Sequence, residues 1–549
     1  MSRTTSSRTQ LLSLFIVSAI PRIMGAFWLP NAFGDAYAYT EQIYYMRKAL
    51  LNGSFSVSNL FGFWLPLYQL ICAAISAVAG DPFYVPKLIS AVCGAGVCVL
   101  VFVLALELTS NKLASVIVTA ILIFNPYHIS YSSSALTDVP HAFFILLCAY
   151  CCIRRRWLIA ACCGLAAGLM RIESWTLVLI IPFVQISVMA GKGGPACKAE
   201  APVGGHTGRS VLSLIVAFLI LAAGPVLWLF VSWKATGSWL RYFEIRNNYI
   251  VETLGASPYL ASFAPARVAF DCLRFVYACN PVVLFASVAL CFVTLRRAGI
   301  LAVPNASAAR SAVKRLCLAA VSSEGVLSIF FFSHLGFLLF AYFTRNQPDI
   351  WPRYGLIFFA LGLPMLAAWI SRPAFDFSRL TLSNEYRSRR VQVWVSVSVA
   401  LFALQFCAQL VDVTRITVMS DPNVTVAQFL DDQRQKDGSM KIYCEDGAIR
   451  VLSGIPLEDF RNQYNSPRYE SAADAQSFLN SLRDNQVRFL VYKDLPGSRL
   501  REIISRLQAH PGRDGITLEE VIPRSRKKAE AVIVYRVHDS EVAKVEQKR

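Results

Sequence analysis

The stretch Pro30–Glu41 has the sequence PNAFGDAYAYTE and carries an aspartate, Asp35, just past the end of the first apolar segment. Apolar runs of membrane-spanning length recur from residue 10 to residue 411. Each run is a candidate helix, because lipid cannot satisfy bare backbone groups. The pattern predicts a helical bundle that crosses the membrane many times, with Asp35 as a carboxylate at a membrane boundary.

The composition supports a membrane protein. Of the 549 residues, 55% are hydrophobic and 16% are charged, which is too apolar for an ordinary soluble protein. The formal net charge is +18, but the basic clusters lie in short loops between apolar runs, as the positive-inside rule predicts for cytoplasmic loops. We therefore expect contact with membrane lipids and no nucleic-acid partner. The first run lacks a small-residue cleavage site, so we interpret it as a retained span.

The charged loops predict the topology by parity. Basic residues near the N-terminus place it in the cytoplasm, so the first span, 10–29, delivers Asp35 to the outer side. The basic cluster 154–156 should also be cytoplasmic, yet an odd number of apolar runs precedes it. One of those runs cannot cross. We choose 64–80, which is short and broken by a glutamine, and predict a helix lying at the outer interface.

With that choice the chain makes about 11 crossings and is mainly α-helical. We predict a transmembrane domain over residues 1–411 and a soluble domain over residues 412–549 outside the membrane. The protein should be integral to the plasma (inner) membrane, with a cytoplasmic N-terminus and a periplasmic or extracellular C-terminal domain. The expected outer loops are 30–83, 131–137, 234–280 and 344–353.

The tail predicts a small α/β domain, because β-rich runs alternate with helix-like runs. The three β-rich runs are 440–446, 487–494 and 531–538. No glycine-rich phosphate loop and no metal-ligand spacing occur in the tail.

Other polar residues accompany Asp35. Arg22 lies within the first span, where a lone guanidinium is costly unless it snorkels, pairs or lines a wet cavity. Asp138 opens a descending span behind serines and a threonine, where it also suits a helix N-cap. Asp35 suits a solvated loop carboxylate or a cap, so position alone leaves a structural role open. We expect His128 and His141, which flank this second loop, at the interface and not in catalysis.

The order of these residues resembles a known class. The stretch PRIMGAFWLPNAFGDAYAY (21–39), followed by YSSSALTDVPHAFF (131–144), resembles the GT-C class of polytopic glycosyltransferases. Within that class it is most similar to the protein O-mannosyltransferase and aminoarabinose-transferase group. GLMRIESW (168–175) looks like the basic turn of those enzymes, and WPRYGLIFFALGLPMLAAW (351–369) opens a late span with the same arginine–tyrosine pair. The likeness runs from residue 10 to about residue 411.

The resemblance implies an inverting transferase that takes a sugar from a polyprenyl-phosphate carrier and delivers it to a hydroxyl acceptor. The acceptor would be a lipid, glycan or protein on the outer side. Asp35 would match the first-loop base that takes the acceptor proton, and Asp138 the second-loop acidic residue. A positioned carboxylate suits this chemistry because a hydroxyl is a weak nucleophile.

The leaving phosphate needs cationic partners, because a guanidinium can hold phosphate oxygens in a fork. The expected substrate-binding residues are Arg22, Tyr37, Arg171, Arg345, Arg353 and Tyr354.

One position departs from the family pattern and leaves the need for a metal open. Many relatives have a glutamate directly after the first-loop aspartate, while this chain has Ala36. A divalent ion would therefore need Asp35 and Asp138 to converge.

Two other functions stay open. A transporter or flippase of a lipid-linked sugar predicts mid-membrane charges in several spans and repeated halves, whereas here such charges are few and no half repeats. A non-catalytic scaffold, whose outer domain binds a partner, survives if both aspartates are caps.

Overall fold

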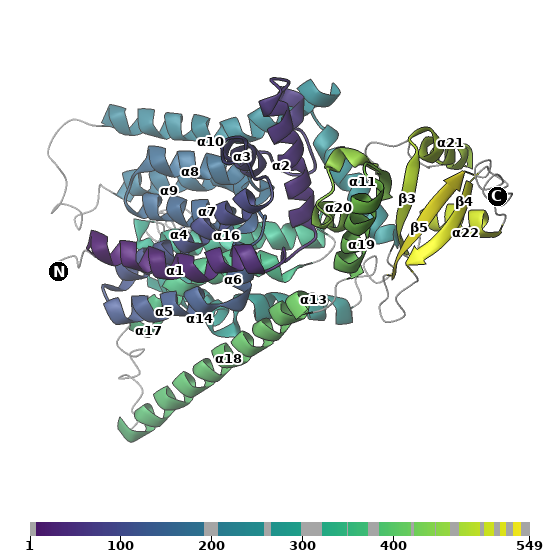
Figure 1. The fold of residues 1–549 in the computed structure, drawn as a ribbon. Helices are drawn as coiled ribbons and strands as arrows, with labels where there is room; N and C mark the ends of the chain where they lie inside the picture. The colour runs from purple at the N-terminus through teal and green to yellow at the C-terminus, as the bar shows by residue number, and fades with distance from the viewer. Residues whose placement is uncertain are drawn as a thin grey trace. The chain divides into compact units, whose positions relative to one another are not determined.

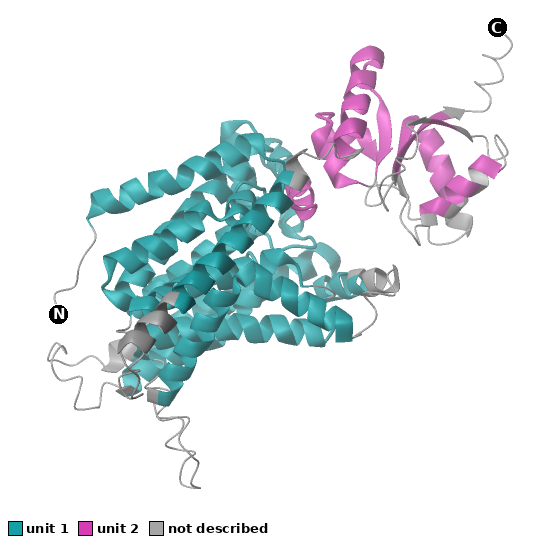
Figure 2. Cartoon of the chain, turned by 90° about the horizontal axis from the view of Figure 1, so that it is seen from below, with its two compact units in different colours: residues 1–32, 43–414 teal, residues 33–42, 415–549 magenta. Residues whose placement is uncertain are grey.

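The computed structural model describes residues 7–191, 207–256, 265–297, 321–347, 350–371, 384–418, 422–444, 446–461, 472–494, 499–509, 516–522 and 531–539. The chain forms two compact units (Figure 2). The first contains Met1–Ala32 and Ile43–Thr414, and the second contains Phe33–Gln42 and Arg415–Arg549. The short segment after α1 thus groups with the C-terminal residues.

The first unit is a bundle of helices (Figure 1). Its first half contains α1 (Arg8–Trp28), η1 (Val57–Leu60), α3 (Leu67–Ala79), α4 (Tyr84–Thr109), α5 (Lys112–Phe124), α6 (Pro126–Ser132), α7 (Asp138–Ile153), α8 (Trp157–Gly168), η2 (Ile172–Thr176) and α9 (Leu177–Gly191). Its second half contains α10 (Thr207–Thr236), α11 (Arg241–Ala256), α13 (Pro265–Cys279), α14 (Pro281–Arg297), α16 (Ser323–Phe343), η4 (Pro352–Tyr354), α17 (Gly355–Ser371) and α18 (Asn384–Val418). Helix α2 (Asp35–Leu51) begins in the second unit and ends in the first.

Seven of the described helices are long and apolar enough to cross a membrane, or up to nine if each bent pair counts as one span. Helices α3, α7 and α8 are apolar but shorter. The helical bundle expected from the sequence is therefore confirmed, while the count of about 11 crossings stays a prediction. The interfacial position of 64–80 also stays a prediction.

Two segments differ from their expected form. The run 113–130 is not one straight span, because α5 and α6 meet at a bend of 62°. The bend falls at Asn125–Pro126, where proline has no backbone donor and Asn125 caps α6 by accepting from His128 N. The expected outer loop 234–280 contains α11 and α13, and α13 meets α14 at 87°.

Helix α4 is the centre of the bundle and packs against α1, α5, α7 and α17. Small residues allow the close approach. A Cβ atom added at Gly94 of α4 would lie 2.4 Å from Ser132 Oγ and 3.0 Å from Arg22 Cδ. This packing brings the α1 arginine against α4 and α6.

The second unit contains a five-stranded sheet in the order β2-β1-β3-β5-β4. Strand β1 pairs in parallel with β2 and β3, while β5 pairs antiparallel with β3 and β4. The strands are β1 (Lys441–Cys444), β2 (Phe460–Arg461), β3 (Val487–Asp494), β4 (Ile516–Ile522) and β5 (Ala531–Asp539). The helices are α19 (Pro422–Asp437), α20 (Gly447–Leu452), η6 (Leu457–Asp459), α21 (Ala472–Asp484) and α22 (Arg499–Ala509).

The three expected β-rich runs form β1, β3 and β5, and two strands were not predicted. Strand β2 has only two residues. Strand β4 is an edge strand whose sequence, ITLEEVI, interrupts the apolar pattern with two glutamates. Edge strands keep charged side chains because their outer edge faces water.

Candidate active site

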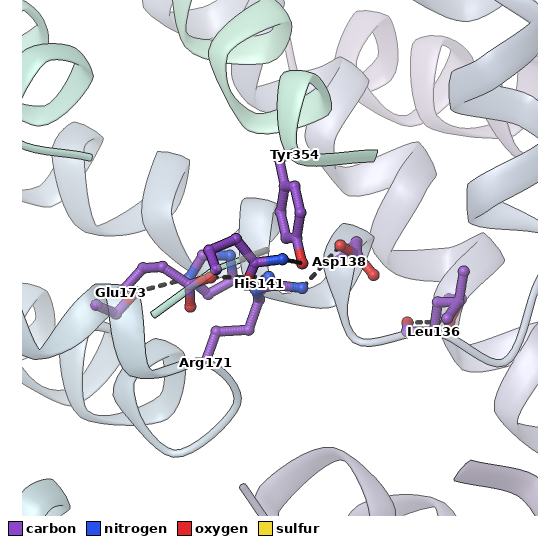
Figure 3. Close-up of polar contacts among 9 residues, drawn as sticks. Leu136, Asp138, His141, Arg171, Glu173 and Tyr354 are labelled. Atoms are coloured by element: carbon purple, nitrogen blue, oxygen red, sulfur yellow. Dashed lines mark hydrogen bonds and ion pairs between the residues drawn. The ribbon is translucent and has the colours of Figure 1, made fainter. Parts of the chain in front are cut away.

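A buried ionic cluster joins α7 to the turn before α9 (Figure 3). Nη1 of Arg171 donates to Oδ1 of Asp138 at 2.8 Å, and Nη2 donates to Oε1 of Glu173 at 2.8 Å. The side chains of Arg171 and Asp138 are only 15% and 6% exposed. One guanidinium therefore holds two carboxylates, and the cluster carries a net negative charge when all three groups are ionised.

A second contact ties the same two elements together. His141 lies one turn after Asp138 on α7, and its Nε2 lies 2.6 Å from Oγ of Ser174. The ring of His334 on α16 lies 6.3 Å from the ring of His141, measured between centroids. The beginning of α7, the η2 turn and α16 thus meet around the cluster.

Tyr354 adds an aromatic face to the cluster (Figure 3). The guanidinium carbon of Arg171 lies 5.3 Å from the centroid of the Tyr354 ring, and that of Arg353 also lies 5.3 Å from it. Both distances suit cation–π contacts. Gln347 donates to the Tyr354 hydroxyl at 2.9 Å. The structure therefore gathers four predicted site residues, Asp138, Arg171, Arg353 and Tyr354.

The buried carboxylate of Asp138 has one oxygen that is not used. Its Oδ2 makes no hydrogen bond among the described residues. The N-cap interpretation of Asp138 is weakened, because the cap position belongs to Thr137 and the Asp138 Oδ1 atom binds Arg171. A buried carboxylate oxygen without a partner is costly, so this oxygen is available to a donor from a water molecule or a substrate.

A small pocket lies beside η4, between α6, α13 and α17. Its lining residues are Asn125, Tyr127, Tyr131, Ala278, Pro352, Leu356 and Phe359. Next to it, the guanidinium carbon of Arg274 lies 5.0 Å from the ring centroid of Trp351. The same arginine pairs with Asp271 at 3.7 Å.

Three of these polar residues, Glu173, Tyr131 and Arg274, are not among the site residues predicted from the sequence. Glu173 had a signal, since it stands two positions after Arg171 in the basic turn. Tyr131 also had a signal, since it opens the stretch 131–144 that resembles the family, whereas Arg274 had none, because it lies within the expected outer loop 234–280.

Arg22 is fully buried in the helices and does not snorkel. Its Nη1 donates to the Ser18 carbonyl at 2.6 Å, and its Nη2 donates to His128 Nδ1 at 2.6 Å and to the Leu122 carbonyl at 3.2 Å. The geometry favours a packing role. His128 and His141 are buried, at 0% and 4% exposed, and their place at the membrane interface stays a prediction.

The remaining predicted residues are Arg345, Asp35 and Tyr37. Arg345 is exposed after the end of α16, with a left-handed φ of 60°. Asp35 is half-buried in the first turn of α2, where the helix dipole favours a carboxylate, and Tyr37 follows it and is buried. Both belong to the second unit, while Asp138 belongs to the first. The convergence of Asp35 with Asp138 therefore stays a prediction.

The described residues give no support for a metal centre. Across those ranges, no three His, Cys, Asp or Glu side chains gather into a set that could hold an ion. Glu173 is bound by Arg171, which competes with a metal for it. We therefore derive no step through a metal.

Comparison with known proteins agrees with this architecture. Residues 10–188 match the family model of dolichyl-phosphate-mannose-protein mannosyltransferase. The expected resemblance to this group of polytopic glycosyltransferases is thereby confirmed over the segment that contains Asp35, Asp138 and Arg171. No curated protein sequence matches the chain.

Solved structures show the fold. ArnT from Cupriavidus metallidurans, in a structure bound to undecaprenyl phosphate, aligns with a TM-score of 0.52 at 13% identity. The alignment covers 96% of this chain and 98% of that chain. The oligosaccharyltransferase of Archaeoglobus fulgidus, tethered with an acceptor peptide, aligns with a TM-score of 0.45 at 12% identity, covering 89% of this chain and 69% of that chain. The likeness to ArnT shows a GT-C fold.

Proposed function

We propose that the protein is a membrane glycosyltransferase that transfers a sugar from a polyprenyl-phosphate donor to a hydroxyl acceptor at the outer face of the membrane. The observation that carries the proposal is the buried cluster of Asp138, Arg171 and Glu173 against Tyr354. Most of this cluster lies in the segment that matches the mannosyltransferase family. The undecaprenyl phosphate in the ArnT structure supports the same class of carrier.

The proposed reaction is a single displacement. The acceptor oxygen attacks the anomeric carbon on the face opposite the phosphate, and the bond from that carbon to the phosphate oxygen breaks. Both electrons of that bond leave with the carrier phosphate, and the anomeric configuration inverts. Asp35 takes the proton of the acceptor hydroxyl, and general-base catalysis of this kind contributes roughly 10²–10⁴-fold to the rate.

The charges of the cluster suggest different roles for its arginines. Arg171 is already compensated by two carboxylates, so we assign it to holding Asp138 in place. Arg353 is half-buried beside the same ring, and we assign it to the departing phosphate. The unpartnered Oδ2 of Asp138 would accept a hydrogen bond from the sugar or the acceptor.

A transfer assay with purified protein and labelled polyprenyl-phosphate sugars tests the proposal. We expect Asp35→Asn to lower transfer by roughly 10²–10⁴-fold while the protein stays folded, because the amide cannot take the proton. Asp81→Asn is the matched control in the same outer loop. Asp81 accepts from the backbone of Phe83 and Tyr84, and asparagine is an equally good cap.

Different results separate the parts of the proposal. Wild-type transfer by a folded Asp35→Asn protein would remove Asp35 as the base. Wild-type protein that transfers no sugar from any polyprenyl-phosphate donor would contradict the function itself.

A further inference from the structure

Within the second unit, the beginning of α2 lies beside α20 of the C-terminal domain. A Cβ atom added at Gly447 would lie 4.0 Å from the backbone nitrogen of Ala38 and 4.0 Å from the Cβ atom of Tyr37. This distance is ordinary van der Waals contact. The first turn of α20 therefore lies against the first turn of the helix that begins at Asp35.

An ion pair adds to this packing. Nη2 of Arg450 lies 2.5 Å from Oε2 of Glu41, and the two side chains are 3% and 13% exposed. Nη1 of the same guanidinium donates to the carbonyl of Cys444, the last residue of β1, at 2.6 Å. One buried arginine thus connects the sheet, α20 and α2.

The pair keeps its charge in this buried place. Burial lowers the pKa of Arg450, but the charge and hydrogen bond of Glu41, together with Cys444 and Asp446, raise it, so the net pKa is raised. Removing one partner of a buried pair leaves the other charge uncompensated, which is far more disruptive than breaking an exposed pair. The Arg488–Asp437 pair in the same unit is exposed, at 53% and 42%, and offers a comparison.

We infer that Arg450 is a positioning residue of the transferase: through Glu41 it fixes the helix whose first turn carries Asp35. The inference rests on the proposed function, in which Asp35 is the base. Glu41 stands six residues after Asp35 on α2, which is about 9 Å along a helix axis, so Arg450 acts through the helix and not on the reacting atoms. A base that is displaced by a small distance loses much of its effect.

Steady-state kinetics of the full-length protein test the inference. We expect Arg450→Gln and Glu41→Gln each to lower kcat by roughly 10–100-fold, while KM for the lipid-linked donor changes less than about twofold. The double variant should lose no more than the more damaged single variant, because both substitutions remove the same contact. Arg450→Lys should recover part of kcat, since it keeps the charge but not the fork.

Hydrogen exchange gives a second measurement that does not depend on activity. In Arg450→Gln, we expect faster amide exchange in the peptide that covers the beginning of α2. Arg488→Gln, which breaks the exposed pair, should change neither the exchange of α2 nor kcat. Glu41→Gln leaves the Arg450–Cys444 bond in place, so it tests the contact even if Arg450→Gln folds poorly.

The outcomes separate the inference from the proposed function. Unchanged exchange at α2 together with unchanged kcat would overturn the inference. Losses that add up in the double variant, with a lower kcat and a higher KM together, would indicate only a general stability role for the pair. This result would also overturn the inference. An inactive wild-type protein would contradict the proposed function. Faster amide exchange in Arg450→Gln would still show that the ion pair fixes the beginning of α2.

Discussion

Arg171 is the residue on which the candidate site depends most, because it contacts two carboxylates and an aromatic ring at the same time. Two carboxylates bind its two terminal nitrogens, and the Tyr354 ring covers it. A planar guanidinium suits all three contacts at once, whereas an ammonium is a single point charge. The identity of this residue as arginine, and not only its charge, should therefore matter.

We predict that Arg171→Gln lowers the free energy of unfolding by about 3–5 kcal/mol, because it leaves Asp138 and Glu173 buried without a cation. Arg171→Lys should keep more stability but lose transfer at least about tenfold, since lysine cannot hold both carboxylates in a fork. Thermal unfolding in detergent and the transfer assay measure the two effects.

Arg241→Gln is the matched control for this experiment. Arg241 pairs with Glu244 at 2.9 Å, but both side chains are about half exposed, at 46% and 49%. Breaking such a pair costs at most about 1 kcal/mol. Equal unfolding temperatures for the Arg171→Gln and Arg241→Gln variants would show that the buried cluster contributes no special stability.

At the scale of elements, the contact between α4 and α6 decides where Arg22 and the bend at Asn125–Pro126 lie. Gly94 allows this close contact, because a Cβ atom at its position would lie only 2.7 Å from Ser132 Cβ. Serine Cβ is fixed to the backbone of α6, so it cannot move without the helix. The two helices must separate if any side chain is added at Gly94.

We predict that Gly94→Ala destabilises the protein by about 1–3 kcal/mol through this overpacking, although alanine is the better helix former. Gly336→Ala in α16 is the control, because nothing lies within 4 Å of its added Cβ atom. The control should be neutral or raise the unfolding temperature. A Gly94→Ala protein as stable as the Gly336→Ala protein would contradict the close packing of α4 on α6.

Hydropathy located the long elements well. The expected span 10–29 corresponds to α1 within a few residues, because a continuous apolar run in lipid satisfies its backbone groups by forming a helix. The bends at α5–α6 and α13–α14 were not predicted, since both arms of α5–α6 are apolar and the α13 arm was taken as loop. Helix α11 mixes charged and apolar residues without a continuous apolar run, so it gives no hydropathy signal.

The site was predictable only as a set of residues. Motifs identified Asp138, Arg171, Arg353 and Tyr354, which the structure brings together from α7, the η2 turn and η4. Their contacts were not predictable, because the charge balance of Arg171 depends on Glu173 and on how η2 packs against α7. For the same reason the sequence could not place Arg22 on His128, which lies 106 positions away.

At the scale of the whole molecule, the grouping of Phe33–Gln42 with Arg415–Arg549 constrains the topology. Glu41 and Arg450 form an ion pair, so both segments lie on the same side of the membrane. Helix α1 is long and apolar enough to cross once between the N-terminus and residue 33. We therefore expect the N-terminus and the C-terminal domain to face opposite sides, with an even number of crossings between Ile43 and Thr414.

We therefore predict opposite faces for the two termini, whatever the exact number of spans. A fluorescent protein fused before Met1 should fluoresce, because the positive-inside rule places that end in the cytoplasm. The same fluorescent protein fused after Arg549 should be exported with that end of the chain and stay dark, while alkaline phosphatase fused there should be active. A fusion after Gly191 is the fluorescent control, because the loop that follows contains Lys192 and Lys198 and the same rule places it in the cytoplasm. Fluorescence from both termini would mean either that Asp35 and the C-terminal domain lie on the cytoplasmic face or that α1 does not cross the membrane. Either result would contradict a transferase that acts at the outer face, since its base would no longer meet an acceptor outside the cell.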